Sequence, residues 1–502
     1  MSRGELANNI WRACDIMRRD DGTSGILEYT EQLSWMIFLK VFEDVEKRFE
    51  DEARFAGREY QPIIEPQYRW SAWAKKDDKE LEKYFSEEEL KEVKKREEHI
   101  LVVFINDKLF PYLRSLQGTS EKEKIAAIFK EIGGNRMKSP YNLKDVINLL
   151  DKIDFNNLED SHALSQLYEE LLLRLGKEGG IAGEIYTPRP IVRLMVKIVD
   201  PRIGETVFDP FCGSCGFLVE SYKRMIESKE LTVEEYEKLQ KETFYAQEKK
   251  PLPYLIGVMN CILHGLLTPN IVRKNTLEDN IRNIPESKRH NVILTNPPFG
   301  GTESPQIQQN FPVQTQATEL LALQYVMKSL KLNGRCGIVL PEGVLFRGDA
   351  FAQVKKELLE NFNLHTIISL PSGVFANVTS SGQGPKTNLL FFDRTGPTKE
   401  IWYYEHIPPG GKKYTKANTI TDEDLTDCYE KWKNRKVSEN SWIVSIEEIR
   451  ERDYDLTARN PNKKQETVYT EPEELVESIL EKEKQILEIL EEFRNILGES
   501  NG

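Results

Sequence analysis

Apolar residues in the first 160 positions recur at the spacing of amphipathic helices. They fall at Leu33, Ile37, Phe38, Val41, Phe42 and Val45, and again at Leu101, Val102, Ile105 and Leu109. Residues spaced in this way lie on one face of a helix. The pattern predicts a mostly α-helical N-terminal domain over residues 1–160. The charge-dense stretch 75–99 is typical of a solvated helix face and is assigned no function.

From about residue 185, short β-branched and apolar runs alternate with helical segments. The runs are TVFDP, TFYAQE, NIVRKN, NVILTNPP, GRCGIVLP, HTIISLP and KTNLLFFD. Strands that alternate with helices form parallel sheets covered by helices on both faces. We therefore predict a Rossmann-like α/β domain, a doubly wound and mostly parallel sheet, over residues 161–425. Ligands of such sheets lie beyond the carboxyl ends of the strands, near the point where the strand order reverses.

The chain turns polar and charged after about residue 425. Close to its end, an apolar stripe recurs on an acidic helical pattern, at Ile479, Ile486, Ile489, Phe493 and Ile496. We predict a C-terminal helical region over residues 426–502 that ends in an amphipathic, subunit-docking helix. Because an isolated helix cannot bury such a stripe, it packs either on its own chain or on another subunit. The sequence leaves both options open.

Composition narrows the class of protein. Hydrophobic residues make up 39% and charged residues 30% of the 502 positions, which is a globular balance. With 69 Lys and Arg against 82 Asp and Glu, the net charge of -13 excludes a chain that coats DNA alone, so any nucleic-acid contact is local or shared with a partner. No apolar run approaches the roughly 18 residues of a membrane span, and six cysteines are too few for a disulfide framework. We expect a cytoplasmic protein.

A glycine-rich turn follows the first predicted strand, in VFDPFCGSCGFLVES. Asp209 ends the strand, and Gly213, Ser214 and Gly216 would let a ligand approach the backbone where a helix begins. The spacing is neither GxGxxG nor GxxxxGK[ST], which disfavours a dinucleotide or a P-loop triphosphate and leaves another nucleoside-like cofactor.

Cys212 and Cys215 form a CxxC pair inside the same turn. Such a pair can be redox-active or half of a zinc site. No second CxxC follows, and no histidine has ligand spacing to this one. We expect small loop residues and no metal.

Two further strand ends carry candidate chemistry. Glu248 ends TFYAQE, about thirty residues after the glycine turn, where an acidic residue can accept hydrogen bonds from both ribose hydroxyls. NVILTNPPFG runs from a buried strand into Asn296, Pro297, Pro298 and Phe299. Two prolines stiffen the turn and remove two donors, so the Pro297 carbonyl and the Asn296 amide oxygen can hold an exocyclic amine. Phe299 offers a ring for stacking on a base rotated out of a duplex.

The motifs EIYTPRP, DPFCGSCGFL, QE, NPPF, LPSGVF and KTNLLFF, in this order, resemble the methyltransferase subunit of type I restriction-modification systems, the HsdM family of adenine-N6 DNA methyltransferases. The resemblance covers most of the chain. It implies S-adenosyl-L-methionine as cofactor and double-stranded DNA as substrate. It also implies a specificity subunit, with two methyltransferase chains for each, and a restriction subunit in the full complex.

Site residues are implied by the same resemblance. Asp209 would support the glycine loop, Glu248 would hold the ribose, and Asn275 would lie near the adenine of the cofactor. Residues implied to line the rest of the cofactor pocket are Glu184, Ile185, Tyr186, Thr187, Pro188, Arg189, Gly213, Ser214, Cys215 and Gly216. The residues implied to be catalytic are Asn296, Pro297, Pro298 and Phe299.

Two departures from the family pattern keep alternatives open. Cys215 stands where the family has a glycine and adds a side chain where the cofactor would approach, and Asn275 stands where the family has Asp. These departures motivate a non-catalytic assembly subunit as one alternative. A methyltransferase for RNA bases or protein glutamine, which shares the Asn-Pro-Pro-aromatic motif, is the other. The Gln-rich segment 300–316 is either an inert insertion or a lid over DNA.

Overall fold

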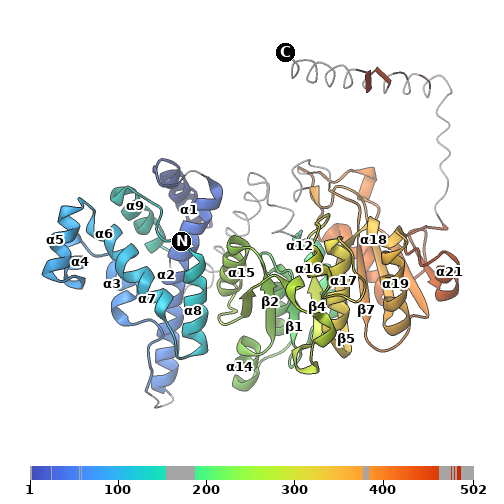
Figure 1. The fold of residues 1–502 in the computed structure, drawn as a ribbon, viewed down its shortest axis with the longest axis horizontal. Helices are drawn as coiled ribbons and strands as arrows, with labels where there is room; N and C mark the ends of the chain where they lie inside the picture. Colours follow the sequence, from blue (N-terminus) through green and yellow to red (C-terminus); the bar gives the residue numbers. More distant parts are fainter. Residues whose placement is uncertain are drawn as a thin grey trace. The chain divides into compact units, whose positions relative to one another are not determined.

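In the computed structural model, residues 187–460 contain a nine-stranded sheet, and helices formed by the first 151 residues lie to one side of it (Figure 1). The structure describes residues 3–23, 25–55, 57, 59–153, 187–376, 384–415 and 417–462, and positions 476, 480, 483, 484, 486 and 487. The strands are β1 (Val207–Asp209), β2 (Phe244–Glu248), β3 (Asn270–Arg273), β4 (His290–Thr295), β5 (Leu330–Pro341), β6 (Asn363–Leu370), β7 (Thr387–Asp393), β8 (Glu400–Glu405) and β9 (Ser441–Ser445).

The strand order is β3-β2-β1-β4-β5-β7-β6-β8-β9. Strand β7 runs antiparallel between β5 and β6, β9 runs antiparallel to β8, and the other pairs are parallel. The chain builds outward from β1 to β3 and then returns to place β4 on the other side of β1. The order therefore reverses between β1 and β4, where such sheets bind ligands.

Helices cover the two faces of the sheet, and successive side chains of each strand point to opposite faces. In β1, Val207 packs with α12, α13 and α15, whereas Phe208 packs with α17 and α19. Val292 and Ile293 of β4 divide in the same way, as the period of two in a strand requires. The helices of this part are α12 (Arg189–Val199), α13 (Gly216–Ser228), α14 (Val233–Lys241), α15 (Pro251–Leu263), α16 (Pro305–Gln308), α17 (Thr318–Ser329), α18 (Glu342–Phe346), α19 (Ala350–Asn361), α20 (Thr426–Lys433) and α21 (Ile446–Glu451).

The N-terminal residues are helical, as predicted. Local signals define the helix starts: Ser86 and Glu89 form a capping box on α5, and Thr119 caps α8. The charge-dense stretch is largely exposed, with α5 burying only Val93. The helices are α1 (Arg3–Arg18), α2 (Ile26–Phe55), α3 (Trp70–Trp73), α4 (Asp78–Leu81), α5 (Glu87–Lys95), α6 (Ile100–Val103), α7 (Phe110–Ser115), α8 (Ser120–Glu131) and α9 (Pro140–Asp151).

Helix α15 joins these helices to the sheet. It contacts α2 and α8 on one side and β2 and β3 on another, so a single hydrophobic core runs through both parts. Polar contacts support the junction: Lys124 Nζ donates to the Thr268 carbonyl at 2.9 Å, and Arg273 pairs with Glu131 at 3.2 Å. The N-terminal helices thus rest on a helix that also supports the sheet.

The fold class is confirmed, and every strand run identified in the sequence forms a strand. The sheet nevertheless continues past the predicted boundary at residue 425, because β9 pairs with β8. Residues 426–460 are therefore not wholly helical as predicted. Trp442 of β9 stacks on Tyr403 of β8 with ring centroids 5.4 Å apart. A five-residue strand in a polar stretch gains its stability from this pairing, which local sequence does not reveal.

Residues 461–502 form a second unit. Its first two residues form a turn, and the described positions from 476 onward, Ile486 among them, are helical. The other stripe residues, Ile479, Ile489, Phe493 and Ile496, lie outside the described residues, and so the packing of the predicted terminal helix stays a prediction. In the described part of the chain, no helix combines the length and the hydropathy that crossing a membrane requires.

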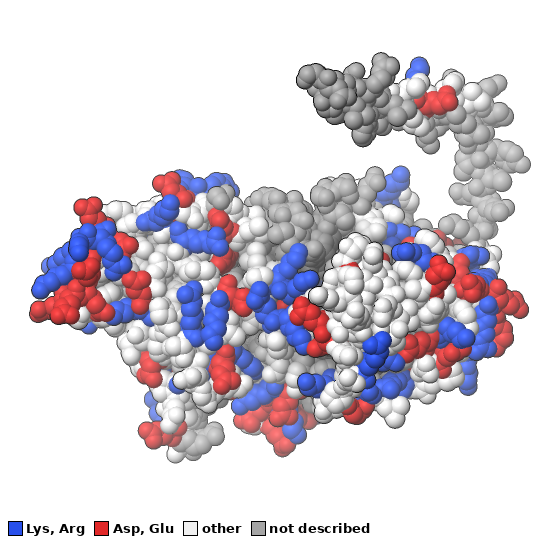
Figure 2. Space-filling model, viewed as in Figure 1, with Lys and Arg blue, Asp and Glu red and all other residues white. Residues whose placement is uncertain are grey.

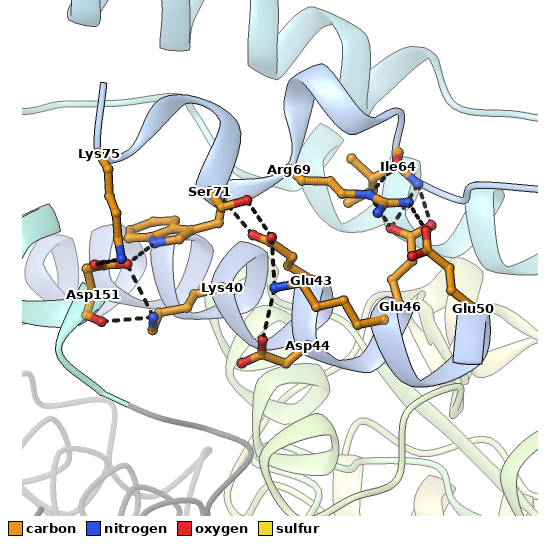
Figure 3. A network of polar contacts seen from close by, with 12 residues as sticks. Lys40, Glu43, Asp44, Glu46, Glu50, Ile64, Arg69, Ser71, Lys75 and Asp151 are labelled. Carbon is orange, nitrogen blue, oxygen red and sulfur yellow. Dashed lines mark hydrogen bonds and ion pairs between the residues drawn. The ribbon is translucent and has the colours of Figure 1, made fainter. Parts of the chain in front are cut away.

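Buried charges hold the segment that follows α2 against that helix (Figure 3). The Glu46 side chain is fully buried and accepts hydrogen bonds from the Ile64 amide and the Tyr60 hydroxyl, both at 3.2 Å. Arg69 lies 3.4 Å from Glu46 and 2.7 Å from Glu50. Burial raises the pKa of Glu46, although Arg69 opposes the shift. The carboxylate of Glu46 therefore depends on its partners to stay charged.

Replacing Glu46 with Ala should lower the free energy of unfolding by about 3 kcal/mol, because buried donors and part of the Arg69 charge lose their acceptor. Glu50→Ala is the matched control: its side chain is 36% exposed, and its loss should cost less than about 1 kcal/mol. Urea unfolding of the full chain measures both values. Equal effects of the two variants would contradict the assigned role of Glu46.

Candidate active site

Asp209 fastens the ends of β1 and β4 to each other. Its Oδ1 accepts hydrogen bonds from the Phe211 amide at 3.1 Å and from the Thr295 hydroxyl at 2.7 Å. Only 1% of the residue is exposed, and burial raises the pKa of Asp209 to about 7. The carboxyl group thus fixes the start of the glycine turn beside the residue that precedes Asn296.

The glycine turn is held from two directions. The Cys212 amide donates to the Gln247 carbonyl at 3.1 Å, and the Gly213 amide donates to Glu248 Oε2 at 3.0 Å. From α15, Asn260 Nδ2 donates to the Ser214 carbonyl at 2.7 Å. Both β2 and α15 therefore determine where the turn lies.

The side chain of Cys215 faces α15. Cys215 is fully buried at φ +57°, and a Cβ on Gly257 of α15 would come within 2.6 Å of its Sγ. The sulfur therefore packs against α15. Burial also raises the pKa of Cys212 and Cys215 well above the usual value for a thiol, so both stay protonated. Protonated, buried thiols fit the expectation of small loop residues.

Glu248 lies at the centre of the carboxyl edge. Only 9% of it is exposed, and its Oε1 accepts from the Lys250 amide at 2.8 Å while Oε2 accepts from Gly213. A carboxylate oriented by two amides retains lone pairs that can accept further hydrogen bonds. This arrangement suits the binding of a diol.

A cavity of about 190 Å³ opens beside Glu248. Asn275 also lines it, although its Oδ1 accepts from the Leu277 amide at 3.3 Å and so caps a short turn. Asp209 and Gly213 to Gly216 are not among the lining residues. The lining residues are Pro210, Phe211, Gln247, Glu248, Lys249, Lys250, Lys274, Asn275, Thr276, Leu277, Asn296, Pro298, Gly301, Thr302, Glu303 and Thr318.

The Asn296 amide is held in one orientation. Its Nδ2 donates to the Thr187 hydroxyl at 3.0 Å, while its Oδ1 is buried and has no hydrogen-bond partner among the described residues. An unpaired buried acceptor costs about 1–3 kcal/mol. Pro297 and Pro298 carry no amide hydrogen that could satisfy it. The oxygen is thus poised to accept a hydrogen bond from a ligand amine.

Phe299 and the segment before α12 complete the surroundings. The ring of Phe299 is half-buried and meets the edge of Phe375, with centroids 6.3 Å apart. Arg189 lies so close to Gly216 that a Cβ there would be 2.3 Å from its Nη1. Pro188 precedes α12 and is half-buried. The predicted site residues Glu184, Ile185 and Tyr186 lie outside the described residues.

The Gln-rich segment 300–316 is anchored in the structure. Phe311 is fully buried, and Gln324 of α17 exchanges two hydrogen bonds with the backbone of Val313, at 3.0 and 2.9 Å. Its first residues, Gly301, Thr302 and Glu303, line the cavity. Figure 2 shows few charged side chains where Figure 1 labels α16, in contrast to the mixed charges over the rest of that face.

Sequence reasoning missed residues that support the site from behind. Gly257 and Asn260 stand three residues apart in the otherwise apolar PLPYLIGVMNCIL of α15, and both contact the glycine turn. A small residue and an amide on one face of an apolar helix are the signal that could have revealed them. Thr295 was missed because a hydroxyl at a strand end has no distinctive pattern.

Comparisons with known proteins find similarity along nearly the whole chain. A model for the N-6 DNA methylase family matches residues 159–469, and one for the HsdM N-terminal domain matches residues 6–150. The EcoEI type I methylase subunit of Escherichia coli is 37% identical over 500 residues, which cover 96% of each chain. The EcoKI methylase subunit of Escherichia coli K12 is 26% identical over 453 residues, covering 85% of this chain and 75% of that protein.

Solved structures that resemble this chain also come from type I restriction-modification systems. A modification subunit assigned to a type I restriction enzyme of Vibrio vulnificus YJ016 is 40% identical, with a TM-score of 0.80 over 92% of this chain and 98% of that one. A chain from a study of complex assembly and conformational transition in the type I R-M system is 48% identical, with a TM-score of 0.77 over 100% of both chains.

Gly257→Ala should weaken binding of S-adenosylmethionine about tenfold, because the added Cβ would lie 2.7 Å from the Gly213 carbonyl and displace the glycine turn. Gly348→Ala is the control, since nothing lies within 4 Å of its added Cβ. Calorimetric titration of each variant measures the affinity. An unchanged affinity in Gly257→Ala would show that the position of the turn does not govern cofactor binding.

Proposed function

The chain belongs to the family of type I restriction-modification methylase subunits, which are adenine-N6 DNA methyltransferases, and we propose that the cavity beside Glu248 is where it performs the methyl transfer. The observation that carries the proposal is the orientation of Asn296. Its amide nitrogen is bound by Thr187, and its buried oxygen has no partner among the described residues, which suits an amine as the acceptor of the methyl group.

S-adenosylmethionine fits the polar groups that line the cavity beside this oxygen. Glu248 would accept hydrogen bonds from the ribose hydroxyls, and Asn275 would contact the adenine. Gly213 to Gly216 would support the methionine part, together with residues 184–189. When bound, this cofactor supplies an electrophilic methyl group on a sulfonium. The remaining chemistry depends on how the chain holds the adenine.

Asn296 Oδ1 and the Pro297 carbonyl would accept the two hydrogens of the adenine amine. Holding both hydrogens directs the nitrogen lone pair toward the methyl group, so positioning accounts for most of the acceleration. Pro298 stiffens the turn, and Phe299 stacks on the flipped base. As the N–C bond formed, the bond between the sulfonium sulfur and the methyl carbon would break and leave a neutral thioether. The adenine nitrogen would become cationic and would lose its extra proton to water. The reaction uses no covalent enzyme intermediate and no metal.

The partners follow from family membership and from charge. A chain with net charge -13 suits a division of labour in which a separate specificity subunit reads the sequence of double-stranded DNA. We propose two copies of this chain for each specificity subunit, a restriction subunit in the full complex, and a cytoplasmic location. The relatives' names identify them as subunits of type I restriction enzymes, which supports this assembly.

Neither alternative gains support from a structural observation. The orientation of Cys215 toward α15 removes one of the two reasons for a non-catalytic scaffold. A methyltransferase for RNA bases or protein glutamine would share the amine-binding turn, and so the polymer that accepts labelled methyl groups decides between these substrates. DNA is the expected acceptor.

Asn296→Ala should lower methyl transfer at least about 100-fold while leaving cofactor binding nearly unchanged, because only the amine loses its acceptor. The assay follows label from S-adenosylmethionine into N6-methyladenine of unmodified DNA, with the specificity subunit co-expressed. Label that appears without Asn296 would contradict its role. Cofactor binding by the intact chain without transfer to DNA would favour an RNA or protein substrate, and absence of binding would favour the scaffold.

Thr187→Val should lower kcat about tenfold, because Asn296 Nδ2 loses the acceptor that fixes the amide orientation. Thr187→Ser is the conservative control, since its hydroxyl can restore the hydrogen bond. Both variants are compared at saturating cofactor, with kcat and KM for DNA measured separately. Equal loss in Val and Ser, or a change confined to KM, would exclude an orienting role for the hydroxyl.

Deleting residues 470–502 should abolish co-purification with the specificity subunit, because the deletion removes the predicted docking helix together with its apolar stripe. The thermal unfolding midpoint of the truncated chain is the control for folding, and cofactor binding should persist. Unchanged complex formation would exclude this segment as the docking element.

A further inference from the structure

A groove of about 520 Å³ lies over β1 to β3 on the face of the sheet opposite α15. Strand β2 shows the asymmetry: Phe244 and Ala246 are buried toward α15, whereas Tyr245 and Gln247 on the other face are only half-buried. Val272 of β3 is 54% exposed on that same face. One wall of the groove comes from residues 279–289 and another from the end of α17. The groove is within the size range of small-molecule sites.

Three buried polar atoms that border this groove have no hydrogen-bond partner among the residues that the structure describes. They are Gln247 Oε1, His290 Nδ1 and Arg289 Nε. Buried polar groups in native proteins are nearly always paired, and each unpaired one costs about 1–3 kcal/mol. Three such atoms around one groove indicate a ligand that carries hydrogen-bonding groups.

The floor of the groove is aromatic. His290 stacks on Phe208 with centroids 4.4 Å apart, and Tyr245 lies 5.0 Å from His290. Burial lowers the pKa of His290 to about 4, so its ring is neutral near neutral pH, with one nitrogen donating and the other accepting. A flat heterocycle with donors and acceptors along its edge complements this floor.

The rim of the groove is positively charged. Lys274 and Arg289 are compensated by Asp279 and Glu286. Lys288 is exposed, and Lys331 lies 3.5 Å from the neutral side chain of Asn291. Within the described residues, neither of these two lysines forms an ion pair. An anionic group on the ligand would complement them.

We propose that this groove binds a nucleotide, with its base on the aromatic floor at Tyr245 and His290 and its phosphate at the lysines of the rim. The site is distinct from the cavity for the methyl donor, although the two adjoin at Gln247 and Lys274. The same chemistry is offered by a free nucleotide and by a residue of a single strand, and the groove is expected to take the free nucleotide.

Titration of the full chain with adenosine monophosphate, after saturation with S-adenosylmethionine, tests the proposal. Binding should persist under saturation and should weaken about tenfold in Tyr245→Ala and in Lys288→Glu. The matched controls are Tyr236→Ala, whose ring is 43% exposed on α14, and Lys91→Glu on α5; both should bind as the parent does. Thermal unfolding midpoints with bound cofactor establish that each variant is folded.

Several outcomes would overturn the proposal. If saturation with S-adenosylmethionine abolishes binding of adenosine monophosphate, the nucleotide occupies only the cofactor cavity. Absence of binding, or equal weakening in the control variants, also excludes the groove. If ribose 5-phosphate binds as tightly as adenosine monophosphate, the base is not recognised. If a short single-stranded oligo(dA) binds more tightly and displaces the mononucleotide, the groove recognises a nucleotide within a single strand. That result would overturn the assignment to a free nucleotide.

Discussion

The hydrogen bond between Asp209 and Thr295 is the constraint on which the rest of the site depends. It joins the carboxyl ends of β1 and β4, the neighbouring strands between which the order of the sheet reverses. One strand leads into the glycine turn and the other into Asn296. Because Asp209 is buried, this contact is shielded from water and fixes the two loops relative to each other.

Glu248, at the end of β2, connects that strand to the glycine turn and to the start of α15. It accepts the Gly213 amide from the glycine turn and the Lys250 amide from the start of α15. Helix α15 in turn supports the turn through Gly257 and Asn260. Another face of α15, with Tyr254, Val258 and Ile262, packs against α2 and α8. A displacement of the N-terminal helices could therefore reach the glycine turn through a single helix, α15.

The candidate site also contains a polar atom that the described part of the chain leaves unsatisfied. Asn296 Oδ1 is buried and has no partner among these residues, although the amide nitrogen of the same side chain is bound. Folding alone would be better served by a paired or apolar residue at this position. The free-energy cost of this unpaired oxygen is consistent with a group whose partner arrives with the substrate. The two prolines that follow Asn296 stiffen the turn and prevent the amide from relaxing toward the backbone.

The sequence determined the fold class, the strand runs and the order of the motifs, because hydrophobic period and turn residues act locally. It also predicted that Glu248 and Asn296 lie at the carboxyl edge of the sheet, since Glu248 ends a recognisable strand and Asn296 directly follows another. Tertiary structure alone decided that β9 completes the sheet, that Cys215 turns toward α15, and that Thr187 orients Asn296 from 109 positions away. These features depend on contacts between segments distant in sequence, and no local pattern records which side of a turn a neighbouring helix will occupy.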